Sequence, residues 1–82
     1  MSSKESLESS EVLFERIATY ARQEEISEFE VFLRAFRSIK GRDPTRQEIK
    51  DIENRDFKSI THHISQKIPP YVQAFLYKEM LS

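Results

Sequence analysis

The sequence lacks several residue types, and each absence excludes a class of protein. Its 82 residues contain no cysteine, no tryptophan and a single glycine. Without cysteine there is no disulfide, no thiol nucleophile and no cysteine-based metal site. One glycine is too few for the glycine-rich loops that bind phosphates, or for a sheet protein with many turns. We therefore expect a fold built from helices and a function without thiol or phosphate-loop chemistry.

Long apolar stretches are also absent. No run approaches the roughly 20 apolar residues that cross a bilayer. Residues 1–11, MSSKESLESSE, lack the apolar core of a signal peptide. We therefore expect a cytoplasmic protein that has no membrane partner.

Apolar residues recur at the three- and four-residue spacing of helices along most of the chain. The pattern predicts a small all-α bundle of four helices, or five if the third one breaks. The expected helices cover 10–23, the segment between Ser27 and Gly41, 46–67 and 70–81. Residues 1–9, rich in serine and glutamate, are expected to form a flexible N-terminal tail, and residues 10–82 a single helical domain.

Several residues mark where these helices begin and end. Ser27 with Glu30, and Thr45 with Glu48, have the spacing of capping boxes. Gly41 follows the second helix, where a left-handed C-cap residue belongs. These local signals predict the helix boundaries independently of the apolar pattern.

The apolar pattern also predicts which residues are buried. The expected stripes are Leu13, Phe14, Ile17, Ala18 and Ala21 in the first helix, and Phe29, Phe32, Leu33, Phe36 and Ile39 in the second. The last helix, Tyr71 to Leu81, has more large apolar residues than one face can hold. Both a helix inserted in the core and a partly exposed contact surface fit this segment.

The third helix contains one irregular interval. Ile49 and Ile52 mark its buried face, but the next apolar residue, Phe57, follows Ile52 by five positions. Either one helix continues with a rotated face, or the chain breaks at 54–56. We favour one long helix, because no glycine or proline interrupts it.

The formal net charge of −1 conceals an asymmetry along the chain. Residues 1–30 have eight acids and three bases, net −5, and residues 31–82 have six acids and ten bases, net +4. Five bases lie between 34 and 46, with only Asp43 as an acid among them. These candidate nucleic-acid-binding residues are Arg34, Arg37, Lys40, Arg42 and Arg46. Such a patch can bind phosphates without reading sequence, although ordinary solvated helix faces would have the same composition.

No pattern in the sequence indicates catalysis. His62 and His63 are adjacent, so a helix would point them about 100° apart, unlike a chelating pair four residues apart. Glu24, Glu25 and Glu28 lie near a helix start, where acids stabilise the helix without further function, and we assign them to partner binding. We therefore expect no catalytic residue, no metal, no cofactor and no small-molecule substrate.

Three short segments resemble the Hha/YmoA family of small enterobacterial regulators of gene expression. Lys67-Ile68-Pro69, with Val72 and Phe75 after it, is similar to the end of that family. Glu53-Asn54-Arg55 falls at the spacing of its Asp-His-Arg triplet, and 26–30 resembles its Ile-Asp-Thr-Leu-Glu helix start. The chain departs from the family over 35–46, and also at Gln73 and Gln23, where the family has tryptophan and cysteine.

The resemblance implies a nucleoid-associated modulator that docks on the N-terminal dimerisation region of an H-NS-type protein and helps to repress transcription. Members of the family present acids to that partner. This role carries over to Glu53, with Arg55 in the same triplet, while Ser27 replaces an acid at the second matched site. Contact with DNA would then be indirect. From their charge, and not from the matched motifs, we expect Arg34, Arg37 and Arg42 to face its phosphates.

Together these observations predict a small non-enzymatic regulator that binds another protein. Two alternatives remain open at this point. One is an unrelated helical adaptor or inhibitor of a host protein, of the size found in phages and plasmids. The other is a regulator that binds DNA directly through the basic residues of 34–46.

Overall fold

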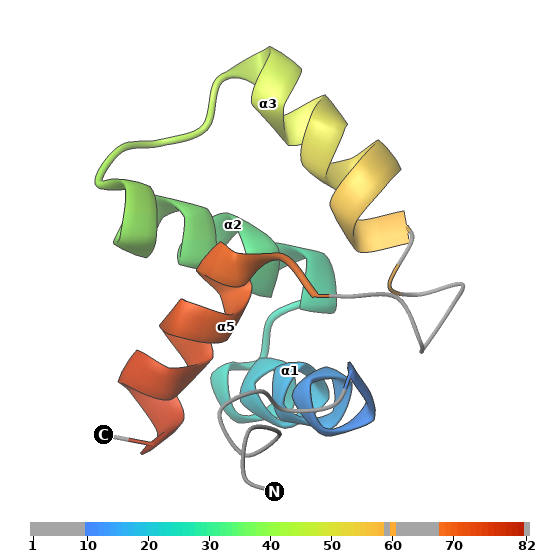
Figure 1. Ribbon diagram of the computed structural model, residues 1–82, viewed down its shortest axis with the longest axis vertical. Helices are drawn as coiled ribbons and strands as arrows, with labels where there is room; N and C mark the ends of the chain where they lie inside the picture. Colours follow the sequence, from blue (N-terminus) through green and yellow to red (C-terminus); the bar gives the residue numbers. More distant parts are fainter. Residues whose placement is uncertain (1–9, 59, 61–67, 82) are drawn as a thin grey trace, which may run out of the picture.

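A computed structural model describes residues 10–58, 60 and 68–81 of the chain. It confirms the all-α prediction, because every regular element in these residues is helical. The elements are α1 (Ser10–Glu24), α2 (Glu28–Lys40), α3 (Arg46–Asp51), η2 (Ile52–Phe57), α5 (Pro70–Leu76) and η3 (Tyr77–Leu81). Because α3 runs into η2 and α5 into η3, the described residues form four helical rods (Figure 1). None of these helices is long and apolar enough to cross a membrane.

Some expectations concern other parts of the chain. The flexible tail over 1–9, the pair His62-His63 and the continuation of the third helix to residue 67 lie outside the described residues.

The core lies where α1, α2 and α5 meet, with α5 crossing α2 (Figure 1). Val31 of α2 and Val72 of α5 are completely buried, and Ile17 of α1 is 1% exposed. The other core residues are Leu13, Tyr20, Ala21, Phe32, Ala35, Phe36, Ile52, Ile60, Ile68, Phe75 and Leu76. The last helix is therefore inserted in the core through Val72, Phe75 and Leu76, while Tyr77 of the same segment is 41% exposed, so the segment has both a buried and an exposed part.

Several residues differ from the apolar stripes that the sequence predicts. Val31 and Ala35 of α2 are completely buried although the predicted stripe omits them, and Ile49, expected on the buried face of the third helix, is only partly buried. Ile39 is 39% exposed, because it lies in the last turn of α2, beyond the last buried residue of that helix, Phe36. Tyr20 is buried although the stripe of the first helix omits it. Its ring packs edge-on against Phe75, with ring centroids 5.4 Å apart. A tyrosine can thus join a core when its hydroxyl finds a partner.

The helix ends follow the predicted caps. The Ser27 hydroxyl accepts a hydrogen bond from the Glu30 N–H, and Thr45 forms a complete capping box with Glu48. Gly41 adopts the left-handed conformation (φ 79°). These positions confirm the starts of α2 and α3 and the end of α2.

The end of α1 has no glycine and still closes in the same way. Glu25 has φ 58°, a left-handed conformation that is uncommon for a residue with a Cβ atom. The Ile26 N–H donates to the Ala21 carbonyl (3.0 Å), and the Glu25 N–H to the Arg22 carbonyl (3.2 Å). This is the Schellman pattern of hydrogen bonds, which here forces a non-glycine residue into a strained position.

A π-helical segment absorbs the irregular interval of the third helix. The chain stays helical through η2 without a break at 54–56, and the Lys58 N–H donates to the Glu53 carbonyl five residues earlier. A helix with i to i+5 hydrogen bonds has a longer repeat per turn than an α-helix. Ile52 and Phe57, five residues apart, can therefore both turn toward α2. The prediction of one continuous helix is confirmed over 46–58.

Candidate functional site

The first candidate site, the basic segment 34–46, is largely neutralised by carboxylates. Arg34 donates from Nη1 to Glu24 Oε1 (3.2 Å) and to the Tyr20 hydroxyl (3.3 Å). The hydrogen bonds with Tyr20 and with Glu24 raise the pKa of Arg34 further above its ordinary value. Arg34 therefore joins α2 to the end of α1.

Arg37 is paired in a similar way. Its Nη2 atom donates to Glu30 Oε2 (3.1 Å), two turns earlier on the same face of α2, and its Nε atom lies 3.8 Å from Asp43 Oδ1. The Glu30 side chain thus pairs with Arg37, while the Ser27 hydroxyl caps the Glu30 N–H. Neither arginine is held ready for an external phosphate.

Arg42 makes the most geometrically specific pair. Its Nη1 and Nη2 atoms donate to the two carboxylate oxygens of Glu48, both at 2.8 Å. Glu48 Oε1 also accepts the Thr45 N–H at 2.9 Å. The bond from Arg42, and after it the bond from the Thr45 backbone, lower the pKa of Glu48 to about 2. The turn before α3 is thus clamped to the first turn of that helix.

Phe36 lies under two cations of the same segment. The Arg42 guanidinium is 5.2 Å from its ring centroid and the Lys40 ammonium is 6.0 Å away. Lys40 and Arg46 have no carboxylate partner among the described residues.

Arg34, Arg37 and Arg42 are thus paired with carboxylates while their side chains stay partly exposed, and their binding to DNA phosphates stays a prediction. The segment itself contains one acid, but Glu24, Glu30 and Glu48 reach it from before and after it in the sequence. A count of charges within a window cannot include such partners.

The second candidate site is the polar side of the helix formed by α3 and η2. No residue of α3 is buried, and Ile52 is the buried residue of η2. Phe57 anchors the far end, because its ring packs edge-on against Phe29 and Phe32, both with centroids 5.4 Å apart. Figure 1 shows this helix leading away from α2 at its α3 end.

We call the exposed side of this helix the outer face. It consists of Arg46, Gln47, Lys50, Asp51, Glu53, Asn54 and Arg55. Of its two acids, Asp51 has a hydrogen-bond partner and Glu53 has none among the described residues. Asp51 accepts from Gln47 Nε2 at 3.3 Å, and on the inner side Asp56 accepts from the Tyr71 hydroxyl at 3.1 Å. Burial and the nearby Asp56 carboxylate raise the pKa of Tyr71.

On the outer face, the charges without an intramolecular partner are mostly cationic. Within the described part of the chain, Arg46, Lys50 and Arg55 have no hydrogen-bond acceptor or ion pair, and Glu53 has no donor. These four side chains are exposed. The outer face therefore combines three cations and one carboxylate that are available to another molecule.

The structure divides the predicted partner-binding residues between two places. Glu53 and Arg55 lie together on the outer face, on η2. Glu24, Glu25 and Glu28 lie where α1 ends and α2 begins. There Glu24 pairs with Arg34 and Glu25 closes α1, so these two acids have structural roles.

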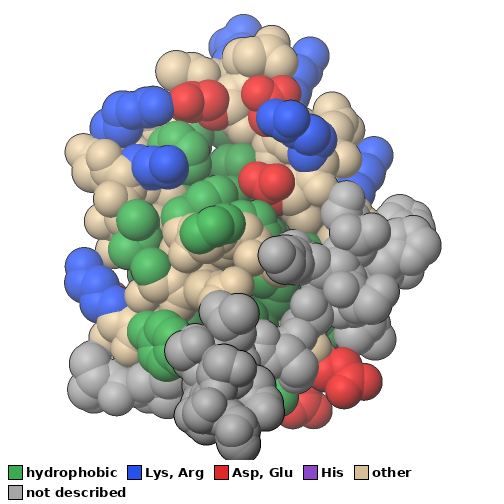
Figure 2. All heavy atoms as spheres, viewed as in Figure 1, with side chains coloured by type: hydrophobic (Ala, Val, Ile, Leu, Met, Phe, Trp, Pro, Cys, Tyr) green, Lys and Arg blue, Asp and Glu red, His purple; other side chains and the backbone are tan. Residues whose placement is uncertain are grey.

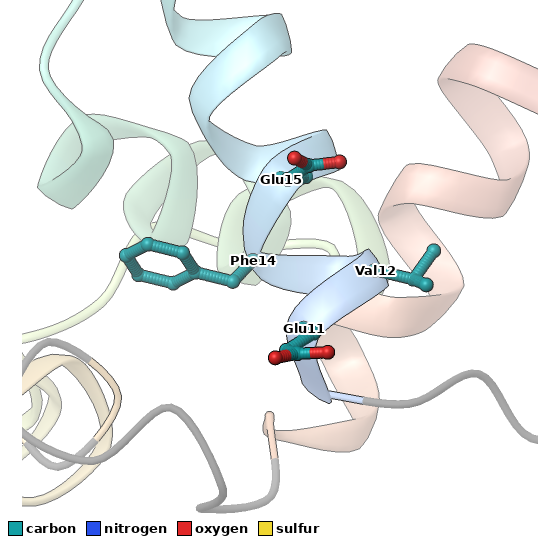
Figure 3. A pocket seen from close by; sticks show the side chains of 4 residues that line it. All are labelled: Glu11, Val12, Phe14 and Glu15. Carbon is teal, nitrogen blue, oxygen red and sulfur yellow. The ribbon is translucent and has the colours of Figure 1, made fainter.

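A third feature is a hollow at the start of α1, which the sequence pattern did not indicate. It is lined by Glu11, Val12, Phe14 and Glu15. In Figure 3, Val12 and Phe14 point to opposite sides of the helix, with the two carboxylates between them. The signal that could have found it is an exposed valine between glutamates four residues apart. No group of three or more metal-binding side chains occurs in the residues that the structure covers.

Comparisons with protein-family models, with curated proteins and with solved structures found no match for this chain. The resemblance to the Hha/YmoA family, which rests on short motifs, therefore stays a prediction.

Proposed function

We propose that this chain is a non-enzymatic regulatory protein that binds another protein through the outer face of α3 and η2. The observation that carries the proposal is a helix that is held firmly although none of α3 is buried. A complete capping box and the pair of Arg42 with Glu48 fix its start. Phe57 fixes its end against α2.

Because α3 contributes no buried residue to the core, we infer that its exposed side chains serve to bind a partner. Short helices in water are marginal, and those of proteins are normally stabilised by burying one face. Here local caps and an ion pair replace that burial at the start of the helix, so exposed side chains are presented in a defined arrangement. Pre-organised side chains bind a partner with less loss of conformational entropy.

The resemblance suggests the first partner to test, an H-NS-type nucleoid protein. The triplet of this chain that resembles the family, Glu53-Asn54-Arg55, lies on the outer face. Glu53 and Arg55 are both exposed and unpaired among the described residues. On this proposal the chain acts at the nucleoid and helps to repress transcription. An adaptor or inhibitor of a different host protein would use the same face.

Direct binding of DNA through 34–46 has less support. Arg34, Arg37 and Arg42 are paired with carboxylates, and three unpaired cations remain on the outer face. Neutralising three phosphates releases few counterions, whereas tight binding of DNA uses about six to ten contacts.

The test is a calorimetric titration of the full chain with a purified H-NS-type protein. The variant Arg55→Glu should bind at least about tenfold more weakly, as expected for an interfacial charge that is reversed. Arg22→Glu is the matched control, because Arg22 is exposed in the last turn of α1. It should bind like the unmodified chain.

Two results would contradict separate parts of the proposal. If the unmodified chain does not bind, an H-NS-type protein is ruled out as its partner. If Arg22→Glu and Arg55→Glu lose affinity equally, the outer face is ruled out as the docking surface. Circular dichroism of each variant shows whether it remains folded.

A further inference from the structure

We infer that two copies of this chain associate, with Arg46 and Lys50 of one copy bound at the hollow on α1 of the other. This inference goes beyond the proposed function, because it assigns a role to α1 and a second copy as the occupant. It rests on the chemistry of the hollow, on the spacing of the charges and on their positions in the molecule.

The hollow suits the side chain of an arginine or a lysine. Val12 is 42% exposed and Phe14, on the opposite side of the helix, is half-buried, so there is apolar surface on each side of the two carboxylates. Glu11 and Glu15 are exposed and have no ion pair in the described part of the chain. A long cationic side chain can lay its methylene stem on apolar surface and keep its charged end at a carboxylate.

The chain itself supplies the matching cations. Arg46 and Lys50 are exposed on α3, four residues apart, and neither has an acceptor within the described residues. Glu11 and Glu15 are also four residues apart, on α1. Residues at this spacing lie about 6 Å apart on one helix face. Two cations on one helix can therefore meet two carboxylates on another.

These two pairs do not meet within one molecule. The chain measures 41 Å along its longest axis, which is vertical in the figures. In Figure 2 acidic side chains appear at the lower end, whereas the upper part shows basic side chains with acidic ones among them. Figure 1 places the start of α1 at the lower end and α3 at the upper end. The complementary charges can neutralise each other only between copies.

Other occupants fit less well. Nucleic acid would be repelled by Glu11 and Glu15, and an acidic protein would leave the hollow on α1 empty. A second copy satisfies both charged surfaces at once, whether the two copies lie antiparallel or head to tail. Exposed ion pairs are individually weak and are screened by salt, so we expect association at high protein concentration and low ionic strength.

The test is sedimentation equilibrium of the full chain at about 20 mM and about 500 mM salt, where the screening length differs several-fold. The unmodified chain should associate at low salt and dissociate at high salt. The double variants Glu11→Lys with Glu15→Lys, and Arg46→Glu with Lys50→Glu, should each be monomeric. Lys40→Glu, a reversal outside both surfaces, should associate like the unmodified chain.

An equimolar mixture of the two double variants is the sharpest measurement. In the mixture, the lysines introduced on α1 of one variant can pair with the glutamates introduced on α3 of the other. The unmodified α3 of the first variant and the unmodified α1 of the second also have opposite charges. We expect association to return. A mixture that stays monomeric, or a double variant that associates alone, would overturn the inference, as would an unmodified chain that is monomeric at low salt.

Failure here is distinguishable from failure of the proposed function. Binding of an H-NS-type protein is measured with Arg55→Glu, and self-association is measured without any partner. A chain that binds the partner and never associates would overturn this inference alone.

Discussion

Arg42 and Glu48 form two parallel hydrogen bonds of 2.8 Å across the turn that precedes α3. The same carboxylate accepts the Thr45 N–H, so one side chain closes the capping box and clamps the turn. An exposed helix with no buried residue thereby begins at a defined place.

The carboxyl of Glu48 should titrate near pH 2, because Arg42 and the Thr45 backbone lower its pKa to about 2 from the ordinary value of 4.5. A lowered pKa in the folded state stabilises the fold above pH 4.5, and this contribution is lost as the pH falls toward 2. Carbon NMR of the carboxyl measures the midpoint. In Arg42→Gln the midpoint should rise toward 4.5, and an unchanged midpoint would show that the pair is not formed.

Replacing Glu25 by glycine should stabilise the protein. Glu25 has φ 58°, a conformation that costs a residue with a Cβ atom about 1 kcal/mol and costs glycine little. The greater flexibility of glycine in the unfolded chain offsets part of this gain. We expect the free energy of unfolding in urea to rise by about 0.5–1 kcal/mol. Glu25→Ala removes the same charge and retains the strain, so it should show no such rise.

Two valines test the burial of the last helix. Val72 is completely buried on α5, whereas Val12 is 42% exposed on α1. Val72→Ala removes two buried methyl groups and leaves a cavity, which should lower the free energy of unfolding by about 2 kcal/mol. Val12→Ala should change it by less than about 0.5 kcal/mol. Equal losses in urea denaturation would contradict the insertion of α5 in the core.

Any binding of DNA should be weak and should depend on the outer face. With Arg46, Lys50 and Arg55 as the unpaired cations of the outer face, the logarithm of affinity should fall with the logarithm of salt concentration with a slope of roughly −3. Arg46→Gln should reduce this slope by about one, and Arg37→Gln, which removes a paired arginine, should leave it unchanged. Fluorescence anisotropy with a labelled duplex measures both. A larger loss for Arg37→Gln would restore the segment 34–46 as a phosphate-binding site.

Much of the fold could be predicted from short-range patterns. Thr45 and Glu48 are three residues apart, and Gly41 directly follows the helix that it ends, so their roles are visible in the sequence. The five-residue interval from Ile52 to Phe57 correctly indicated an irregular turn. The sequence could not specify a π-helical segment there, because a break or a rotated face would have produced the same interval.

The candidate sites were harder to predict, because charges pair across elements. The sequence suggested an exposed basic segment, but Glu24 comes from α1 and Glu48 from α3 to pair with Arg34 and Arg42. Which apolar residues are buried likewise depends on which helices meet. Ile39 continues the apolar stripe of α2, yet it lies beyond Phe36, the last buried residue of that helix, and is 39% exposed.

By itself the sequence determined the all-α class, the starts of α2 and α3, the end of α2 and the absence of cysteine, because caps, spacing and composition act over a few residues. Only the tertiary structure decided which charges remain unpaired. That property depends on which helices meet, and it moved the candidate surface from the segment 34–46 to the outer face of α3 and η2.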